Sequence, residues 1–227
     1  MSSHDSRLLI IDTSTSFLSL GLYQCGETSC VYEAAGNKQS ELILPTIRQL
    51  LKQANLSLSQ LDAIVYAQGP GAFTGLRIGL GVAHGLALPF ELPLIAIPCL
   101  DAVAAQVVNQ SCVLAATDAR MNELFYAWYD TKQNIRLSDY HVAAASEICR
   151  PEDQCNGIGV GVGNAFALDI ALPVTGSSQM PNASHYAQLA LSGRYTPVPA
   201  TEANLLYVRN KIALTAAEQA AKRLAAI

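Results

Sequence analysis

Apolar and polar residues alternate in short blocks at the start of the chain. Apolar runs at residues 8–11, 17–23 and 30–34 are separated by a polar stretch after Asp12 and by a turn at residues 24–27. Short apolar runs between turn-forming residues are typical of β-strands. We therefore expect the chain to begin with an antiparallel meander of three strands.

Helical spacing replaces this pattern further along. Between residues 40 and 54 the apolar side chains recur once per helical turn, with Ser40 as a candidate N-cap. An apolar run at residues 62–67 predicts a buried strand, and it leads into the glycine-rich stretch QGPGAFTGLRIGLG at 68–81. We place this stretch at a strand-to-helix junction, with the helix beginning near Thr74.

Glycine occupies positions 75, 79, 81 and 85 of this second helix. Each interior glycine costs a helix about 1 kcal/mol relative to alanine. Glycines one turn apart let another backbone approach to a distance that a Cβ atom would prevent. Gly75 and Gly79 lie on one face and Gly81 and Gly85 on another, so we expect the helix backbone to approach the chain's own sheet closely on one side and another helix on the other.

The same glycines also suggest a phosphate-binding loop. A Walker A loop needs a lysine after its last glycine, and no lysine follows here. A dinucleotide fingerprint needs a shorter spacing than the one that separates Gly71 from Gly75. Anion binding at the start of the helix stays open, with Thr74 and Arg77 able to hold an anion.

The second half of the chain repeats the plan of the first. Residues 113–130 again give an apolar strand, an aspartate, a polar turn and an apolar strand, so that Asp118 takes the place of Asp12. A repeated plan of this kind predicts two related lobes. We place the first at residues 1–109 and the second, smaller one at residues 110–227.

The other elements are less regular. We expect a strand at 94–97, helices at 100–108 and 182–191, and a loosely docked, alanine-rich helical tail at 210–226. Glycine at every second position from 157 to 163 leaves one face of a strand without side chains. Another group should approach that face closely.

Composition narrows the class of protein. Hydrophobic residues make up 51% and charged residues 14% of the 227 residues, which excludes a disordered chain. The formal net charge of −4 provides no basic field that could hold a polyanion such as RNA without a partner. The N-terminal apolar run is too short for a signal peptide and prolines interrupt the later runs, so we expect a cytoplasmic protein without a membrane span.

The residues that usually carry catalysis are scattered. The six cysteines form no C-x-x-C motif, and we expect them to be free thiols in a reducing compartment. The four histidines stand singly, and no serine lies in a G-x-S-x-G elbow. We therefore expect no metal site and no activated nucleophile.

Two aspartates are the candidates for a nucleotide or anion site. Asp12 precedes Thr13 and Thr15, and a carboxylate with hydroxyl groups at a strand end can hold magnesium and a phosphate. Asp118 precedes no glycine that would let the backbone close on a phosphate. A turn stabilised by short polar side chains is the alternative, and we favour it.

Four segments carry a resemblance to a known family. They are IIDTSTS at 10–16, SELILPTI at 40–47, DAIVYAQGPGAFTGLRIGLGVAHGLA at 62–87 and TDARMNELFYAWY at 117–129. Together they resemble the TsaB family, also called YeaZ, of bacterial threonylcarbamoyladenosine biosynthesis proteins. The string G-P-G-x-F-T-G-L-R-I-G is the most specific of the matches.

The resemblance implies an α/β protein with the two-lobed ASKHA fold of actin, Hsp70 and sugar kinases. It also implies a non-catalytic subunit that binds and activates a related subunit, TsaD, which transfers a threonylcarbamoyl group to adenosine 37 of tRNAs that read codons beginning with A. TsaD carries an H-x-x-x-H pair in the counterpart of the first helix, whereas residues 37–41 here contain no histidine. ATP and metal are therefore expected on partner subunits, and no cofactor on this chain.

The resemblance further implies that the two helices of the first lobe form an interface with TsaD, or with a second copy when the chain is alone. An ATPase, TsaE, would join the assembly, and tRNA would be reached indirectly through the complex. The expected interface residues are Leu42, Pro45, Ile47, Leu50, Phe73, Thr74, Gly75, Arg77, Ile78, Gly81, His84 and Gly85.

Two other functions stay open. A small ASKHA-type phosphotransferase or ATPase would use Asp12, Thr13, Thr15 and Asp118. Peptide hydrolysis is the more remote alternative, because the chain shows neither a metal pair nor an activated nucleophile.

Overall fold

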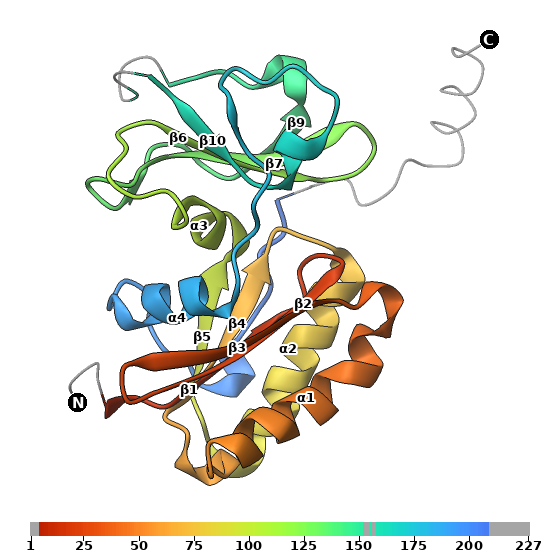
Figure 1. Cartoon of the computed structure of the whole chain (residues 1–227), viewed down its shortest axis with the longest axis vertical. Helices are drawn as coiled ribbons and strands as arrows, with labels where there is room; N and C mark the ends of the chain where they lie inside the picture. The colour runs from red at the N-terminus through yellow and green to blue at the C-terminus, as the bar shows by residue number, and fades with distance from the viewer. Residues whose placement is uncertain (1–4, 152–154, 156–157, 209–227) are drawn as a thin grey trace.

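The computed structural model describes residues 5–151, 155 and 158–208, and they form two lobes, each built on one β-sheet (Figure 1). The first sheet has the strand order β3-β2-β1-β4-β5. Its strands are β1 (Leu8–Asp12), β2 (Phe17–Gln24), β3 (Glu27–Ala34), β4 (Ala63–Gly69) and β5 (Leu94–Pro98). The first three strands are antiparallel, which confirms the predicted meander, and β4 and β5 run parallel to β1.

Alternating side chains of β1 explain why this sheet is covered on both faces. Leu9 and Ile11 pack in one core with helices α1 (Gln39–Gln53) and α2 (Phe73–Ala87). Leu8 and Ile10 pack in a second core with helix α4 (Ala183–Leu191). Successive side chains of a strand point to opposite faces, so a strand buried on both sides is apolar throughout.

The second sheet has the order β11-β10-β6-β7-β8, and β9 also pairs with β7. Its strands are β6 (Val113–Asp118), β7 (Glu123–Asp130), β8 (Ile135–Arg136), β9 (His141–Ala144), β10 (Val160–Val162) and β11 (Gly176–Ser177). The antiparallel pair β6–β7 with parallel β10 beside it repeats the arrangement of β1, β2 and β4. This duplication gives the two-lobed ASKHA-like fold that the resemblance implied.

Helix α3 (Cys99–Ala104) lies between the two lobes (Figure 1). It is shorter than the helix predicted at 100–108, because residues 105–107 leave the α-helix in turns and Val108 is exposed. The helix predicted at 182–191 is confirmed as α4, with Asn182 as its N-cap. The predicted tail helix at 210–226 lies outside the described residues.

The chain returns to the first lobe after the second sheet. Helix α4 packs against β1, β2 and β3 of the first sheet, although residues 110–227 were predicted as one lobe. Val198 then pairs with Leu94 at the free edge of β5. Helix α4 and Val198 thus pack with the first sheet, and the division of the chain at residues 109 and 110 stays a prediction.

The start of α1 differs from the prediction. The helix begins at Gln39, and Lys38 rather than Ser40 is the N-cap, because the 3-10 turn Gly36–Lys38 runs directly into it. The buried Gln39 side chain fixes this entry by donating hydrogen bonds to the carbonyl oxygens of Thr15 and Phe17. An anchoring side chain thus fixes the start of α1, and its N-cap residue makes no side-chain capping hydrogen bond.

The prediction of free cysteines is wrong for two of the six. Cys112 and Cys155 form a disulfide, with their Cα atoms 4.9 Å apart. They are 43 residues apart in the sequence, and only folding of the second lobe brings both buried residues together. The other four thiols are free.

The predicted close approach at the alternating glycines is confirmed at Gly159 and Gly161 of the second lobe, whereas residue 157 lies outside the described residues. A Cβ atom at Gly161 of β10 would overlap the ring of Phe166, and one at Gly159 would lie 2.5 Å from Val174. Side chains of the following turns therefore occupy the bare face of this strand.

Candidate functional site

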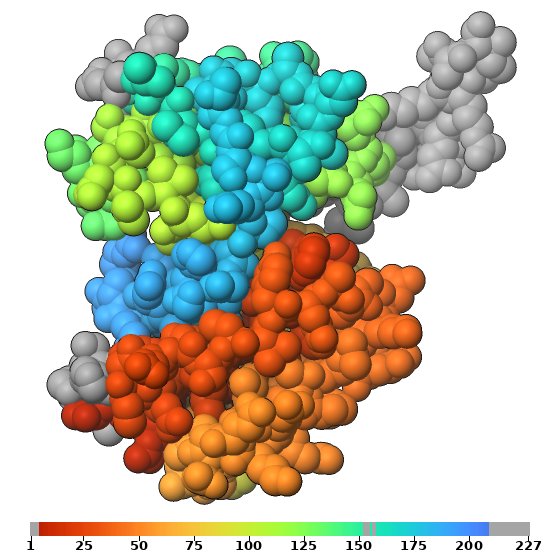
Figure 2. Space-filling model, viewed as in Figure 1, coloured from red at the N-terminus to blue at the C-terminus, as the bar shows by residue number. Residues whose placement is uncertain are grey.

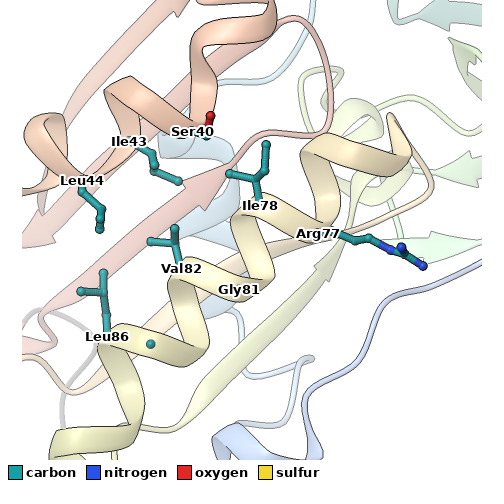
Figure 3. Close-up of a pocket in the computed structure, with 9 residues that line it drawn as sticks. Ser40, Ile43, Leu44, Arg77, Ile78, Gly81, Val82 and Leu86 are labelled. Atoms are coloured by element: carbon teal, nitrogen blue, oxygen red, sulfur yellow. The ribbon is translucent and has the colours of Figure 1, made fainter.

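Helices α1 and α2 leave an open groove on the first lobe, with a volume of about 500 Å³. Figure 3 shows Leu44 of α1 on one side and Ile78, Val82 and Leu86 of α2 on the other, while Arg77 points away from these aliphatic side chains. The lining residues are Ser40, Ile43, Leu44, Arg77, Ile78, Gly81, Val82, Gly85 and Leu86. The groove is thus mostly aliphatic, with one charged residue at its border.

The inner glycines of α2 hold this helix against the sheet. A Cβ atom at Gly75 would overlap the carbonyl oxygen of Thr13, and one at Gly79 would lie 2.5 Å from the Thr13 hydroxyl oxygen. That hydroxyl donates a hydrogen bond of 2.7 Å to the Gly75 carbonyl oxygen. The predicted close packing of this helix on the chain's own sheet is therefore confirmed, and the structure shows that Gly75 and Gly79 are the glycines that make it.

The outer glycines of α2 have different surroundings. A Cβ atom at Gly81 or Gly85 would meet no atom within 4 Å in the described chain beyond the helix's own turns. Both residues are exposed and line the groove. Nothing in the described part of the chain therefore fills the space that these glycines leave.

The expected interface residues fall into two groups. Pro45, Phe73, Thr74, Arg77, Gly81 and Gly85 are exposed, and Leu42, Ile78 and His84 are half-buried. In contrast, Ile47, Leu50 and Gly75 are buried in the core of the first lobe. Ile47 and Leu50 belong to the stripe that α1 turns toward its own sheet, and Gly75 of α2 lies against Thr13, so these three residues support the groove from the core.

Sequence reasoning missed apolar residues that the groove exposes. Leu44 is 47% exposed, and Val82 and Leu86 line the α2 side. Beyond the end of α2, Leu88 and Phe90 are 55% and 44% exposed. The exposure of Leu44 could have been predicted from the sequence, because this leucine lies outside the apolar stripe of α1.

An aromatic and cationic cluster lies at the start of α2. The Arg77 guanidinium carbon is 3.8 Å from the centroid of the Phe73 ring, and the Phe73 and Tyr207 rings are 6.0 Å apart. A guanidinium over an aromatic face gains electrostatic attraction while its remaining donors stay available. This end of the groove is therefore suited to an acidic or polar partner surface.

The four anion candidates do not form one site. A cleft of about 720 Å³ between the lobes is lined by Thr15 and Asp118, whereas Asp12 and Thr13 are buried outside its lining. Asp12 accepts a hydrogen bond from the Ser14 backbone, and burial raises the pKa of its carboxyl. Of the four candidates, only two therefore reach the cleft.

The carboxylate of Asp118 is bonded to a residue of its own turn. It accepts a hydrogen bond from the backbone of Arg120 and forms an ion pair with the Arg120 side chain at 3.1 Å. Thr15 accepts a hydrogen bond from the backbone of Phe17. These contacts are the polar turns that we favoured over a phosphate site.

Cys99 is the thiol at the wall of this cleft. Burial raises its pKa to about 12, so the thiol stays protonated at neutral pH and is a poor nucleophile. Among the described residues, no three His, Cys, Asp or Glu side chains are grouped so that they could hold a metal ion. No described helix is long and apolar enough to cross a membrane.

Comparison with known proteins extends over the groove and both lobes. A family model described as TsaD, tRNA N6-adenosine threonylcarbamoyltransferase, matches residues 30–226. The tRNA threonylcarbamoyladenosine biosynthesis protein TsaB of Haemophilus influenzae is 34% identical over 224 residues, which cover 90% of this chain and 94% of the relative. The protein of the same name from Escherichia coli is 35% identical over 169 residues, 70% of this chain and 72% of the relative.

Solved structures agree with these relatives. The structure of YeaZ from Pseudomonas aeruginosa is similar with a TM-score of 0.79 at 31% identity, covering 89% of this chain and 99% of that chain. A second Pseudomonas aeruginosa structure, described as similar to the peptidase YeaZ, gives the same TM-score over 90% of this chain. The structural similarity thus extends over most of the chain.

Proposed function

This chain belongs to the TsaB family of tRNA threonylcarbamoyladenosine biosynthesis proteins, and we propose that it is a non-catalytic subunit that binds and activates a TsaD-type subunit. The reaction that it supports is threonylcarbamoylation of adenosine 37 in tRNAs that read codons beginning with A. The open groove between α1 and α2 is the observation that carries this proposal.

The groove has the properties of a protein-binding surface. It exposes aliphatic side chains that water solvates poorly, and contiguous exposed apolar surface is typical of interaction sites. Gly81 and Gly85 give no packing benefit within the described chain, although each costs the helix about 1 kcal/mol relative to alanine. A partner helix that approaches them closely would recover this cost.

The TsaD match supports the choice of partner. A family model for the transferase covers residues 30–226, so a TsaD-type chain is similar in sequence to the region that contains the groove. Two related chains can pair through equivalent helices, and the same face would pair with a second copy when the chain is alone. The net charge of −4 favours contact with tRNA through the complex and not by this chain alone.

The remaining chemistry is assigned to other subunits in this proposal. Asp12 is buried and Asp118 is bonded within its own turn, so the candidates for a phosphate site are engaged by this chain's own contacts. ATP and metal are therefore placed on the TsaD-type subunit and on a TsaE-type ATPase, and the complex is placed in the cytoplasm.

Substitution of Gly81 by leucine tests the proposal. The leucine side chain has room in the free chain, so Gly81→Leu should leave the circular dichroism spectrum and the melting temperature at or above those of the native chain. It should fill the groove and weaken the complex with the TsaD-type subunit by about 100-fold or more, since a clash in a packed interface costs several kcal/mol. Light scattering of the mixture and a tRNA threonylcarbamoylation assay measure both effects.

A matched control is Gln188→Leu, which adds the same side chain at an exposed position of α4 on the opposite face of the sheet. It should bind and activate as the native chain does. A folded Gly81→Leu variant that still forms the complex and supports modification would refute the assignment of the groove.

A further inference from the structure

One carboxylate joins segments from both lobes. Asp101 of α3 accepts hydrogen bonds from three tyrosine hydroxyl groups. Tyr129 and Tyr140 donate to Oδ1 at 2.7 Å each, and Tyr195 donates to Oδ2 at 2.8 Å. Hydrogen bonds of this length to an ionised acceptor are about twice as strong as those between neutral groups.

The three tyrosines come from different parts of the fold. Tyr129 lies on β7, and Tyr140 lies between β8 and β9, so both belong to the second lobe. Tyr195 follows α4, whose buried face packs on the first sheet. In Figure 2 the blue segment that includes α4 fills the space between the green lobe and the red strands of the other lobe.

Helix α3 itself belongs to both cores. Cys99 and Ala102 pack in the core that contains α4, whereas Leu100 and Val103 pack in the core of β6 and β7. Asp101 therefore stands on a helix that packs in the cores of both lobes, and its carboxylate is the acceptor that Tyr129 and Tyr195 share.

The hydroxyl groups remain donors over the whole physiological range of pH. Burial and the charge of Asp101 raise the pKa of Tyr129, Tyr140 and Tyr195 above the ordinary value. Two positive charges lie nearby: the Arg136 guanidinium carbon is 3.9 Å from the centroid of the Tyr140 ring, and that of Arg194 is 5.6 Å from the centroid of the Tyr195 ring. All three bonds are thus maintained at neutral pH.

A second hydrogen bond joins the segment after α4 to the second lobe, next to the bond between Tyr195 and Asp101. Arg194 donates a hydrogen bond of 2.9 Å to the carbonyl oxygen of Asn134, which lies in the turn between β7 and β8. Arg194 and Tyr195 thus connect the segment after α4 to the second lobe by two consecutive side chains.

We propose that Asp101, Tyr129, Tyr140 and Tyr195 form a clamp that fixes the angle between the two lobes. Two lobes that share a cleft move relative to each other by default unless their interface is large or strongly bonded. With the clamp in place, the cleft keeps one width and the chain presents the groove as part of a rigid body. The clamp is formed within the free chain, so this proposal does not depend on which partner binds in the groove.

Distance measurements between the lobes test the clamp. Spin labels on unnatural amino acids at exposed Gln53 of α1 and exposed Lys132 of the second lobe report the lobe–lobe distance by pulsed electron paramagnetic resonance. The native chain should give one narrow distribution. Asp101→Ala should give a broader distribution with a second population, because its three donors lose their shared acceptor.

Two further variants separate a clamp from a general loss of fold. Tyr195→Phe combined with Arg194→Ala removes the links of one segment without changing either core, and it should also broaden the distribution. Tyr126→Phe is the matched control. Tyr126 lies on β7, as Tyr129 does, but it packs beside His141 in the core on the opposite face of the second sheet. A broad distribution in the native chain, or narrow distributions in the folded variants, would overturn the proposal.

Discussion

The two glycine pairs of α2 place the same residue type in opposite surroundings. Gly75 and Gly79 face the turn after β1, where any Cβ atom would collide with Thr13. Gly81 and Gly85 face the groove, where a Cβ atom would meet nothing within 4 Å beyond the helix's own turns. The fold of this chain requires glycine at the inner pair and does not require it at the outer pair.

The difference shows how a structural glycine is distinguished from one kept for a partner. Each glycine costs the helix about 1 kcal/mol relative to alanine, whichever way it faces. The inner pair recovers this cost through the packing of α2 on β1 and through the bond between Thr13 and Gly75. The outer pair recovers nothing within the described residues, and the proposed docking of a partner helix explains why it is there.

The strongest test of the inner pair is Gly75→Ala. The added methyl group would be forced against the Thr13 carbonyl, and backbone on both sides leaves neither group free to move away. We expect the free energy of unfolding to fall by about 3 kcal/mol, as for an overpacked core. Urea denaturation measures the change, with Gly81→Ala as the control on the open side. A loss below about 0.5 kcal/mol, which is usual for surface positions, would contradict the close approach.

Local sequence patterns predicted the elements that this comparison uses. The apolar stripe of α1 and the position of α2 after a buried strand follow from spacing alone, and so does the repeat that relates Asp118 to Asp12. Spacing also divided the four glycines of α2 into two pairs on different faces, although only the structure shows that Gly75 and Gly79 face the sheet. These features depend on residues close together in the sequence.

Features that depend on distant residues were not predictable in this way. Asp101 meets Tyr195 across 94 positions, and the disulfide closes a separation of 43. No pattern along the chain marks which tyrosine reaches which carboxylate. For the same reason the burial of Asp12, which removes it from the cleft, was visible only once the chain had folded.

Thr13→Val separates hydrogen bonding from packing at the inner pair. Valine keeps the shape of threonine but cannot donate to the Gly75 carbonyl, so the free energy of unfolding should fall by about 1 kcal/mol. Amide hydrogen exchange should rise in the first two turns of α2, where the bond acts. Thr15→Val, in the same turn but without a bond to α2, should leave that exchange unchanged. Equal exchange in both variants would mean that packing alone holds the helix.

Gly85→Ala should change the free energy of unfolding least, and it should separate the stability of the free chain from its affinity for the partner. Alanine has room at this position and is the better helix former, so the free energy of unfolding should rise by up to about 1 kcal/mol. If a partner helix approaches Gly85 closely, the same methyl group should weaken the complex by about tenfold, which corresponds to about 1.4 kcal/mol. Urea denaturation of the free chain and calorimetric titration with the TsaD-type subunit give the two values. Opposite signs would show that glycine is kept here for the partner, whereas a gain in both would show that the outer pair carries no such constraint.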